Sequence, residues 1–151
     1  MIPRYPDMEK RVALYPGSFN PFTIGHLSIL ERGLRLFDKV VVVIGCNGAK
    51  DSSRTSADEL RSKLAHLTGV EVMEWDGLTV DAATKVGAGW LLRGVRSVAD
   101  YEYERNLADI NRELTGIDTV LLTAEPRLAM VSSSMVRELR HFGHDVSDYI
   151  V

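Results

Sequence analysis

The stretch Lys39–Gly45 constrains the fold of this chain more than any other part of the sequence. Four consecutive valines and an isoleucine follow Lys39, with no polar residue among them. A strand with one face in water alternates polar and apolar side chains, whereas an unbroken β-branched run is typical of a strand buried on both faces. This run therefore predicts an interior strand of a parallel sheet with helices on both sides.

Strand-like and helix-like segments alternate along the rest of the chain, with glycines, prolines and capping serines between them. The pattern predicts an α/β fold: a doubly wound, Rossmann-like, five-stranded parallel sheet. We expect one domain of residues 1–151, of which 1–10 form a flexible N-terminal extension. The expected strands are 12–15, 39–45, 70–74, 90–92 and 119–123, and the expected helices are 26–37, 56–66, 78–86, 98–114 and 132–141.

Charge and cysteine content narrow the class of protein. A net charge of -3 over 151 residues argues against binding nucleic acid by bulk electrostatics, so an anionic ligand must be met by a local cluster of cations. The single cysteine, Cys46, excludes an internal disulfide framework and a multi-cysteine zinc site, which favours the cytoplasm. We expect neither a signal peptide nor a membrane-spanning segment.

The first expected strand leads through a turn rich in glycine and proline into a helix. In this arrangement the free N–H groups and the positive dipole end of the helix face the end of the strand, where an anion can bind. Gly25 allows a ligand to approach the backbone closely. His26 stands at the helix start, where its imidazole can donate an N–H to a phosphate oxygen without a full charge.

Further phosphate-compatible groups follow other strands. Lys50 lies in the loop after the second strand, and Arg93 and Arg96 follow the fourth. The serine run at 132–134 lies between the fifth strand and the last helix. Because the carboxyl ends of parallel strands meet at one edge of a sheet, we expect these groups to face the same ligand as His26. Guanidinium forks, hydroxyls and helix N–H groups together suit a polyphosphate.

Four stretches, in the same order, resemble the bacterial phosphopantetheine adenylyltransferases of the nucleotidylyltransferase superfamily. They are PGSFNPFTIGH at 16–26, LRGVR at 92–96, DYEYE at 100–104 and VSSSMVR at 131–137. The resemblance implies transfer of AMP from ATP to 4′-phosphopantetheine in coenzyme A biosynthesis, giving dephospho-coenzyme A and pyrophosphate. It further implies direct in-line attack without a covalent enzyme intermediate, Mg²⁺ carried by ATP, a homo-hexamer, and feedback inhibition by coenzyme A.

The same resemblance implies roles for individual residues. His26 stabilises the transition state, and Lys50 and Arg93 complete the catalytic set. The phosphopantetheine side consists of Ser18, Lys50, Thr79 and Arg93. The ATP side consists of Ser18, Phe19, His26, Gly94, Val95, Arg96, Glu104, Leu128, Ala129, Met130, Val131, Ser132, Ser133 and Ser134.

Two positions depart from the pattern, and other functions stay open. Ser18 and Asn20 stand where the family more often has threonine and aspartate, and Asn20 lacks a carboxylate. One alternative is a nucleotidylyltransferase acting on nicotinamide mononucleotide, or a cytidylyltransferase acting on an alcohol phosphate. Another is a nucleotide- or coenzyme-binding module without catalysis. A dinucleotide oxidoreductase is disfavoured because no G-x-G-x-x-G follows the first strand.

Overall fold

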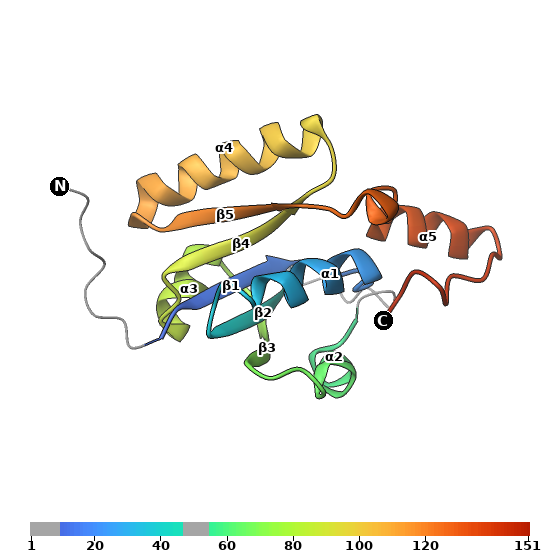
Figure 1. Ribbon diagram of the computed structural model, residues 1–151, viewed down its shortest axis with the longest axis horizontal. Coiled ribbons are helices and arrows are strands. Elements are labelled where there is room, and N and C mark those ends of the chain that lie inside the picture. Colours follow the sequence, from blue (N-terminus) through green and yellow to red (C-terminus); the bar gives the residue numbers. More distant parts are fainter. Residues whose placement is uncertain (1–9, 47–54) are drawn as a thin grey trace.

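The computed structural model describes residues 10–46 and 55–151, which form a five-stranded parallel sheet with helices on both faces (Figure 1). The strands are β1 Val12–Gly17, β2 Lys39–Gly45, β3 Val70–Trp75, β4 Trp90–Val95 and β5 Asp118–Thr123. Their order is β3-β2-β1-β4-β5, so the direction of winding reverses between β1 and β4. Ligands of such sheets bind beyond the carboxyl ends of the strands at this reversal. The predicted doubly wound fold is confirmed.

Two apolar layers hold the helices against the sheet. Valines 40 to 43 of β2 are at most 3% exposed, and they alternate between the two layers, as the unbroken β-branched run predicts. Leu30 and Leu60 belong to the layer on one face, and Val80 belongs to the layer on the other. The helices are α1 Ile24–Gly33, α2 Ala57–Leu64, α3 Thr79–Val86, α4 Val98–Thr115 and α5 Ser133–His141, with a 3-10 turn at Pro126–Leu128.

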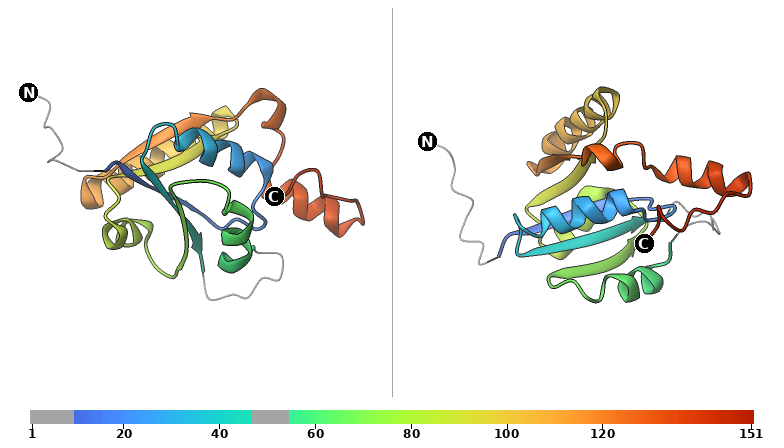
Figure 2. Two further views of the ribbon diagram at one scale, coloured as in Figure 1. Left: turned by 60° about the horizontal axis from the view of Figure 1, so that its bottom comes forward. Right: turned by 45° about the vertical axis from the view of Figure 1, so that its right-hand side comes forward.

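Helix α1 packs unusually close to β4. A Cβ atom built on Gly94 would lie 2.9 Å from Cγ1 of Ile29. The absent side chain at Gly94 therefore allows α1 to approach the end of β4, which brings the N-terminal turn of α1 next to the residues that follow this strand. Helix α5 lies beyond the same end of the sheet in all three views (Figures 1 and 2).

Two local predictions were wrong. The fourth strand runs to Val95, so Arg93 and Gly94 lie within β4 and do not follow it. Pairing with the whole of β5 extends β4 beyond its short apolar run. The first helix was expected to run to residue 37 but ends at Gly33, and Leu36 is 42% exposed in the turn that follows.

The apolar face of α4 points largely away from the sheet. Tyr101, Ile110 and Leu114, which recur at helical spacing, are each about half exposed. The residues of α4 that are buried are Glu104 and Ala108. The spacing gives an amphipathic helix correctly, but it does not say what the apolar side packs against.

No helix among residues 10–46 and 55–151 is long and apolar enough to cross a membrane.

Candidate active site

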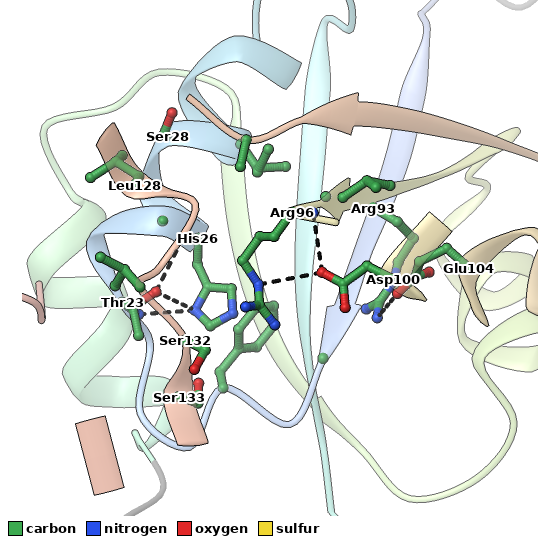
Figure 3. Close-up of a pocket in the computed structure, with 18 of the residues that line it drawn as sticks. Thr23, His26, Ser28, Arg93, Arg96, Asp100, Glu104, Leu128, Ser132 and Ser133 are labelled. Carbon is green, nitrogen blue, oxygen red and sulfur yellow. Dashed lines mark hydrogen bonds and ion pairs between the residues drawn. The ribbon is translucent and has the colours of Figure 1, made fainter. Parts of the chain in front are cut away.

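A hollow of about 460 Å³ lies at the carboxyl edge of the sheet, where β1, β4 and the starts of α1 and α5 meet (Figure 3). Its lining includes His26, Arg93, Arg96 and the three serines at 132–134. The structure therefore brings together, in one hollow, three of the four groups that the sequence placed at this edge. The fourth, Lys50, lies outside the described residues, and its expected roles stay predictions.

The two ring nitrogens of His26 have different surroundings. Nδ1 accepts a hydrogen bond from the backbone N–H of Thr23, at 2.9 Å. Because a backbone N–H can only donate, Nδ1 must be unprotonated, so the ring proton of the neutral imidazole is on Nε2. The Thr23 hydroxyl accepts the backbone N–H of His26 in return, which completes a capping box at the start of α1.

The pKa of His26 is lowered from 6.5 to about 3. Burial is the main cause, and the positive charges of Arg93 and Arg96 add to it. The imidazole is therefore neutral at physiological pH. It can donate one N–H from Nε2 to an anionic ligand without itself carrying a charge.

The rings of Phe19 and Phe22 pack against the imidazole of His26. The Phe19 ring stands edge-on to it with centroids 5.0 Å apart, and the Phe22 ring is 5.3 Å away. Phe19 is 2% exposed and has a φ of +44°, a backbone conformation that bulky residues rarely adopt. A Cβ atom on Gly17 would lie 2.9 Å from this ring, which explains glycine there. Phe19, expected on the ATP side, thus supports His26 with its side chain.

Arg93 and Glu104 form a bidentate ion pair in which the carboxylate is buried and the guanidinium is partly buried. Arg93 Nε and Nη2 donate to the two carboxylate oxygens at 2.8 and 2.7 Å, and Nη1 donates to the carbonyl of Pro16. Burial alone would lower the pKa of Arg93, but the hydrogen bonds and charge of Glu104 outweigh it and raise this pKa. Glu104 was expected beside ATP, and it lies at the edge of the hollow as the partner of Arg93 (Figure 3).

Arg96 lies between His26 and Asp100 (Figure 3). Its Nε is 3.5 Å from Asp100 Oδ2, and its backbone N–H donates to the same oxygen at 3.1 Å. The backbone N–H of Asp100 donates to the hydroxyl of Ser97, the N-cap of α4, which fixes the position of Asp100. This arrangement leaves the guanidinium beside the hollow, where an anion can meet it.

The three serines have different hydrogen bonds. The hydroxyl of Ser132 caps α5 by accepting the N–H of Met135, at 3.0 Å. Ser133 Oγ donates to the carbonyl of Pro21 at 2.7 Å, and Ser134 Oγ accepts from Arg137. The free N–H groups of the first turn of α5 remain for a phosphate, and so do the hydroxyl protons of Ser132 and Ser134, which only accept in these bonds.

The loop before α5 contributes unequally to the hollow. Leu128 and Val131 line it, together with Gly94 and Val95. Ala129 and Met130, expected on the ATP side, are not part of its lining, and Met130 is 74% exposed. The 3-10 turn at Pro126–Leu128 sets this alternation by turning Leu128 inward.

A second hollow of about 500 Å³ lies on the other side of β4. Thr79, expected on the phosphopantetheine side, lines it with Trp75 and Leu78. The two hollows share Gly17, Ser18, Arg93, Tyr103 and Glu104. The sheet edge therefore carries two connected sites with an arginine at their junction.

Several supporting residues were not found by sequence reasoning. The spacing of Thr23 and His26 is that of a capping box, and this local signal could have been recognised. Thr55 accepts the N–H of Phe22 at 3.0 Å, and Arg137 donates to the carbonyl of Asn20 at 2.6 Å. The first of these two contacts spans 33 positions in the sequence and the second spans 117, so no local pattern predicts them.

Comparisons with known proteins show the fold and the family of this chain. A family model described as cytidylyltransferase-like matches residues 14–139. A solved structure of a putative nicotinate-nucleotide adenylyltransferase from Vibrio parahaemolyticus superposes with a TM-score of 0.66 at 21% identity, covering 94% of this chain and 87% of that one. A bifunctional NMN adenylyltransferase/ADP ribose pyrophosphatase from Francisella tularensis gives a TM-score of 0.67 at 13% identity, covering 93% of this chain and 44% of that one. The fold is that of the nucleotidyltransferases, and the family model places this chain among the cytidylyltransferase-like proteins.

Curated relatives identify the family more closely. A phosphopantetheine adenylyltransferase of Porphyromonas gingivalis is 48% identical over 95% of both chains. Those of Bacteroides thetaiotaomicron and Corynebacterium diphtheriae are 43% and 39% identical, over 93% of this chain and 95% and 91% of theirs. The chain belongs to the phosphopantetheine adenylyltransferase family.

Proposed function

We propose that this chain transfers the AMP group of ATP to 4′-phosphopantetheine, giving dephospho-coenzyme A and pyrophosphate. The observation that carries the proposal is the meeting of the two hollows at Ser18 and Arg93. The first hollow, which contains His26, Arg96 and the serine run, has the helix N-termini and cations that suit a nucleoside triphosphate. The other is lined mainly by apolar residues and suits the arm of the acceptor.

In the proposed reaction the acceptor phosphate attacks the α-phosphorus of ATP directly and in line, with no covalent enzyme intermediate. The obstacle is electrostatic, because two like unit charges 4 Å apart repel by about 4 kcal/mol at an effective dielectric of 20. Arg93 and Arg96 offset this repulsion. His26 donates its Nε2–H to an α-phosphate oxygen as charge builds there in the transition state.

Arg93 can bind the acceptor phosphate without losing Glu104. A guanidinium has five N–H donors, and the described contacts with Glu104 and Pro16 use three of them. One N–H on each Nη remains. Glu104 therefore acts as a brace that fixes the direction in which these two donors point.

We propose that Mg²⁺ enters with ATP as part of the substrate. Among the described residues, no three carboxylate, imidazole or thiol side chains come together as a metal cage. Asp100 and Glu104, two carboxylates that line the first hollow, are paired with arginines. This donor set fits an ion held chiefly by phosphate oxygens, where it neutralises part of the triphosphate charge.

The test is pyrophosphate release from ATP with 4′-phosphopantetheine as acceptor. Nicotinamide mononucleotide, an alcohol phosphate, and CTP in place of ATP serve as comparisons. Turnover with ATP and phosphopantetheine at least a hundredfold above the other pairs supports the proposal. Preferred turnover of another pair, or binding of ATP by calorimetry without any turnover, contradicts it.

We propose a homo-oligomer, a hexamer as the family resemblance implies. A stripe of apolar side chains along α4 supports this: Tyr103, Ile110 and Leu114 are 61, 56 and 57% exposed, and Leu107 lies between them. An exposed apolar surface of this kind commonly marks a protein interface.

We further propose feedback inhibition by coenzyme A. Adding coenzyme A to the pyrophosphate assay tests it. We also propose a cytoplasmic location, which the single cysteine favours.

A further inference from the structure

Within residues 10–46 and 55–151, a single buried side-chain oxygen or nitrogen lacks a hydrogen-bond partner: Oγ1 of Thr119, in β5. A buried hydroxyl without a partner lowers stability, because it has left water and gained nothing in exchange. Valine has nearly the same shape and an equal preference for strands. Shape alone therefore does not explain a threonine at this position.

The position of Thr119 in the sheet shows which site its side chain borders. Thr119 pairs in register with Leu91 of β4, and paired residues of neighbouring strands project from the same face. Leu91 is 1% exposed and packs in the apolar layer with Val80 of α3. Thr119 and Leu91 both line the second hollow, and neither lines the nucleotide hollow.

The second hollow has the composition expected for a ligand arm that mixes methylene and amide groups. Its walls are mostly apolar, with aliphatic, aromatic and glycine residues, and the polar residues Ser18, Arg93 and Glu104 stand at its junction with the first hollow. Thr79, Asn111 and Thr119 are polar residues that line the second hollow alone, and of their side chains that of Thr119 has the buried oxygen without a partner. A phosphate at the junction would extend its organic arm along the walls of this hollow, to which Thr119 contributes, and a hydroxyl there can donate to a carbonyl or accept from an N–H.

We propose that the Thr119 hydroxyl forms a hydrogen bond with an amide of the phosphorylated acceptor and is a binding residue of the acceptor site. This inference rests on the proposed function, because it takes the second hollow as the acceptor site. The hydroxyl lacks a protein partner because the ligand supplies one. The cost that it imposes on the free protein is recovered when the acceptor binds.

The test compares Thr119→Val and Thr119→Ser with the unaltered chain. Thr119→Val should raise KM for phosphopantetheine roughly five- to tenfold, the size of effect expected for one hydrogen bond, with kcat and KM for ATP unchanged. Its Tm should equal or exceed that of the unaltered chain, because no protein contact is lost. Thr119→Ser keeps the hydroxyl and should keep KM within about twofold. Thr123→Val, an exposed position of the same strand, is the control.

An unchanged KM for phosphopantetheine in Thr119→Val overturns the inference, as does an equal rise in KM for ATP, which would indicate general distortion. Failure of the proposed function gives a different result, since the unaltered chain would then release no pyrophosphate. In that case calorimetry with phosphopantetheine, comparing the unaltered chain and Thr119→Val, still tests the hydroxyl. Equal affinities of the two proteins would refute it.

Discussion

The Nδ1 atom of His26 accepts a hydrogen bond that fixes the ring, and its Nε2–H remains available to a ligand. Asparagine at this position can place its carbonyl oxygen where Nδ1 lies, so it can still accept the N–H of Thr23, but it has no donor at the position of Nε2. We expect His26→Asn to lower kcat by about 10²–10³-fold, as loss of one transition-state donor does, while the Kd for ATP changes by only a few fold. Steady-state kinetics and calorimetry measure the two quantities.

Comparison of His26→Ala with His26→Asn separates the effect of losing Nδ1 from the effect of losing Nε2. It should match His26→Asn in kcat but show a lower Tm, because the buried N–H of Thr23 loses its acceptor. Equal losses of turnover and ATP affinity in both variants would contradict the role given to Nε2.

The lowered pKa of His26 makes stability depend on pH. The folded protein has a pKa of about 3 at this residue and the unfolded chain about 6.5, so between these values the unfolded chain binds more protons. The contribution of the neutral imidazole is therefore fully present above pH 6.5 and is lost as the pH falls towards 3. From pH 7 to 4.5, we expect the unaltered chain to lose about 2 kcal/mol more than His26→Asn. Urea unfolding of both proteins at both pH values measures this; parallel losses would show that His26 titrates normally.

The close packing of α1 on β4 links the strand to the position of His26. Gly94→Ala places a methyl group 2.9 Å from Ile29 Cγ1, so α1 or the Ile29 side chain must move, at a cost of about 1–3 kcal/mol. Gly45→Ala is the matched control, because it also changes a glycine at the carboxyl end of a strand and its nearest neighbour is 3.8 Å away. Urea unfolding should show a loss for the first variant and little change for the second.

A second substitution identifies the cause of that loss. Ile29→Ala removes the atoms that the new methyl group meets, so the double variant Gly94→Ala with Ile29→Ala should be less destabilised than the sum of the two single variants. Simple additivity would mean that the Gly94 methyl group disturbs something other than the contact between α1 and β4.

For the whole molecule, the outward apolar stripe on α4 extends beyond the second hollow, which Tyr103, Leu107 and Ile110 line, to the exposed Leu114, which lines neither hollow. Leu114→Glu places a charge in this stripe, outside both hollows, and should convert the proposed oligomer to smaller species in light scattering after size exclusion. Arg105→Gln makes the same change of net charge at an exposed position on another side of α4 and should leave the assembly intact. Retention of the oligomer by Leu114→Glu would assign the interface to another surface.

Local patterns in the sequence were sufficient for the fold and for the location of the site. The unbroken run of β2, the alternation of strands and helices, and the serine caps of α2, α4 and α5 each depend on residues close together in the chain. Parallel connections then require the strand ends to share one edge. Because of that requirement, the order of the segments along the chain is enough to place His26, Arg96 and the serine run together.

The tertiary structure alone decided how those residues are held and what the remaining surfaces do. The pairing of Arg93 with Glu104 and Pro16, the neutral state of His26 and the unpartnered hydroxyl of Thr119 depend on segments that are distant in sequence. So does the outward face of α4. Hydrophobic spacing says that a side of a helix is apolar, and residue type says that a group can donate a hydrogen bond. What the apolar side packs against, and which group accepts the hydrogen bond, are fixed only when the whole chain has packed. Burial and distance are properties of the assembled fold.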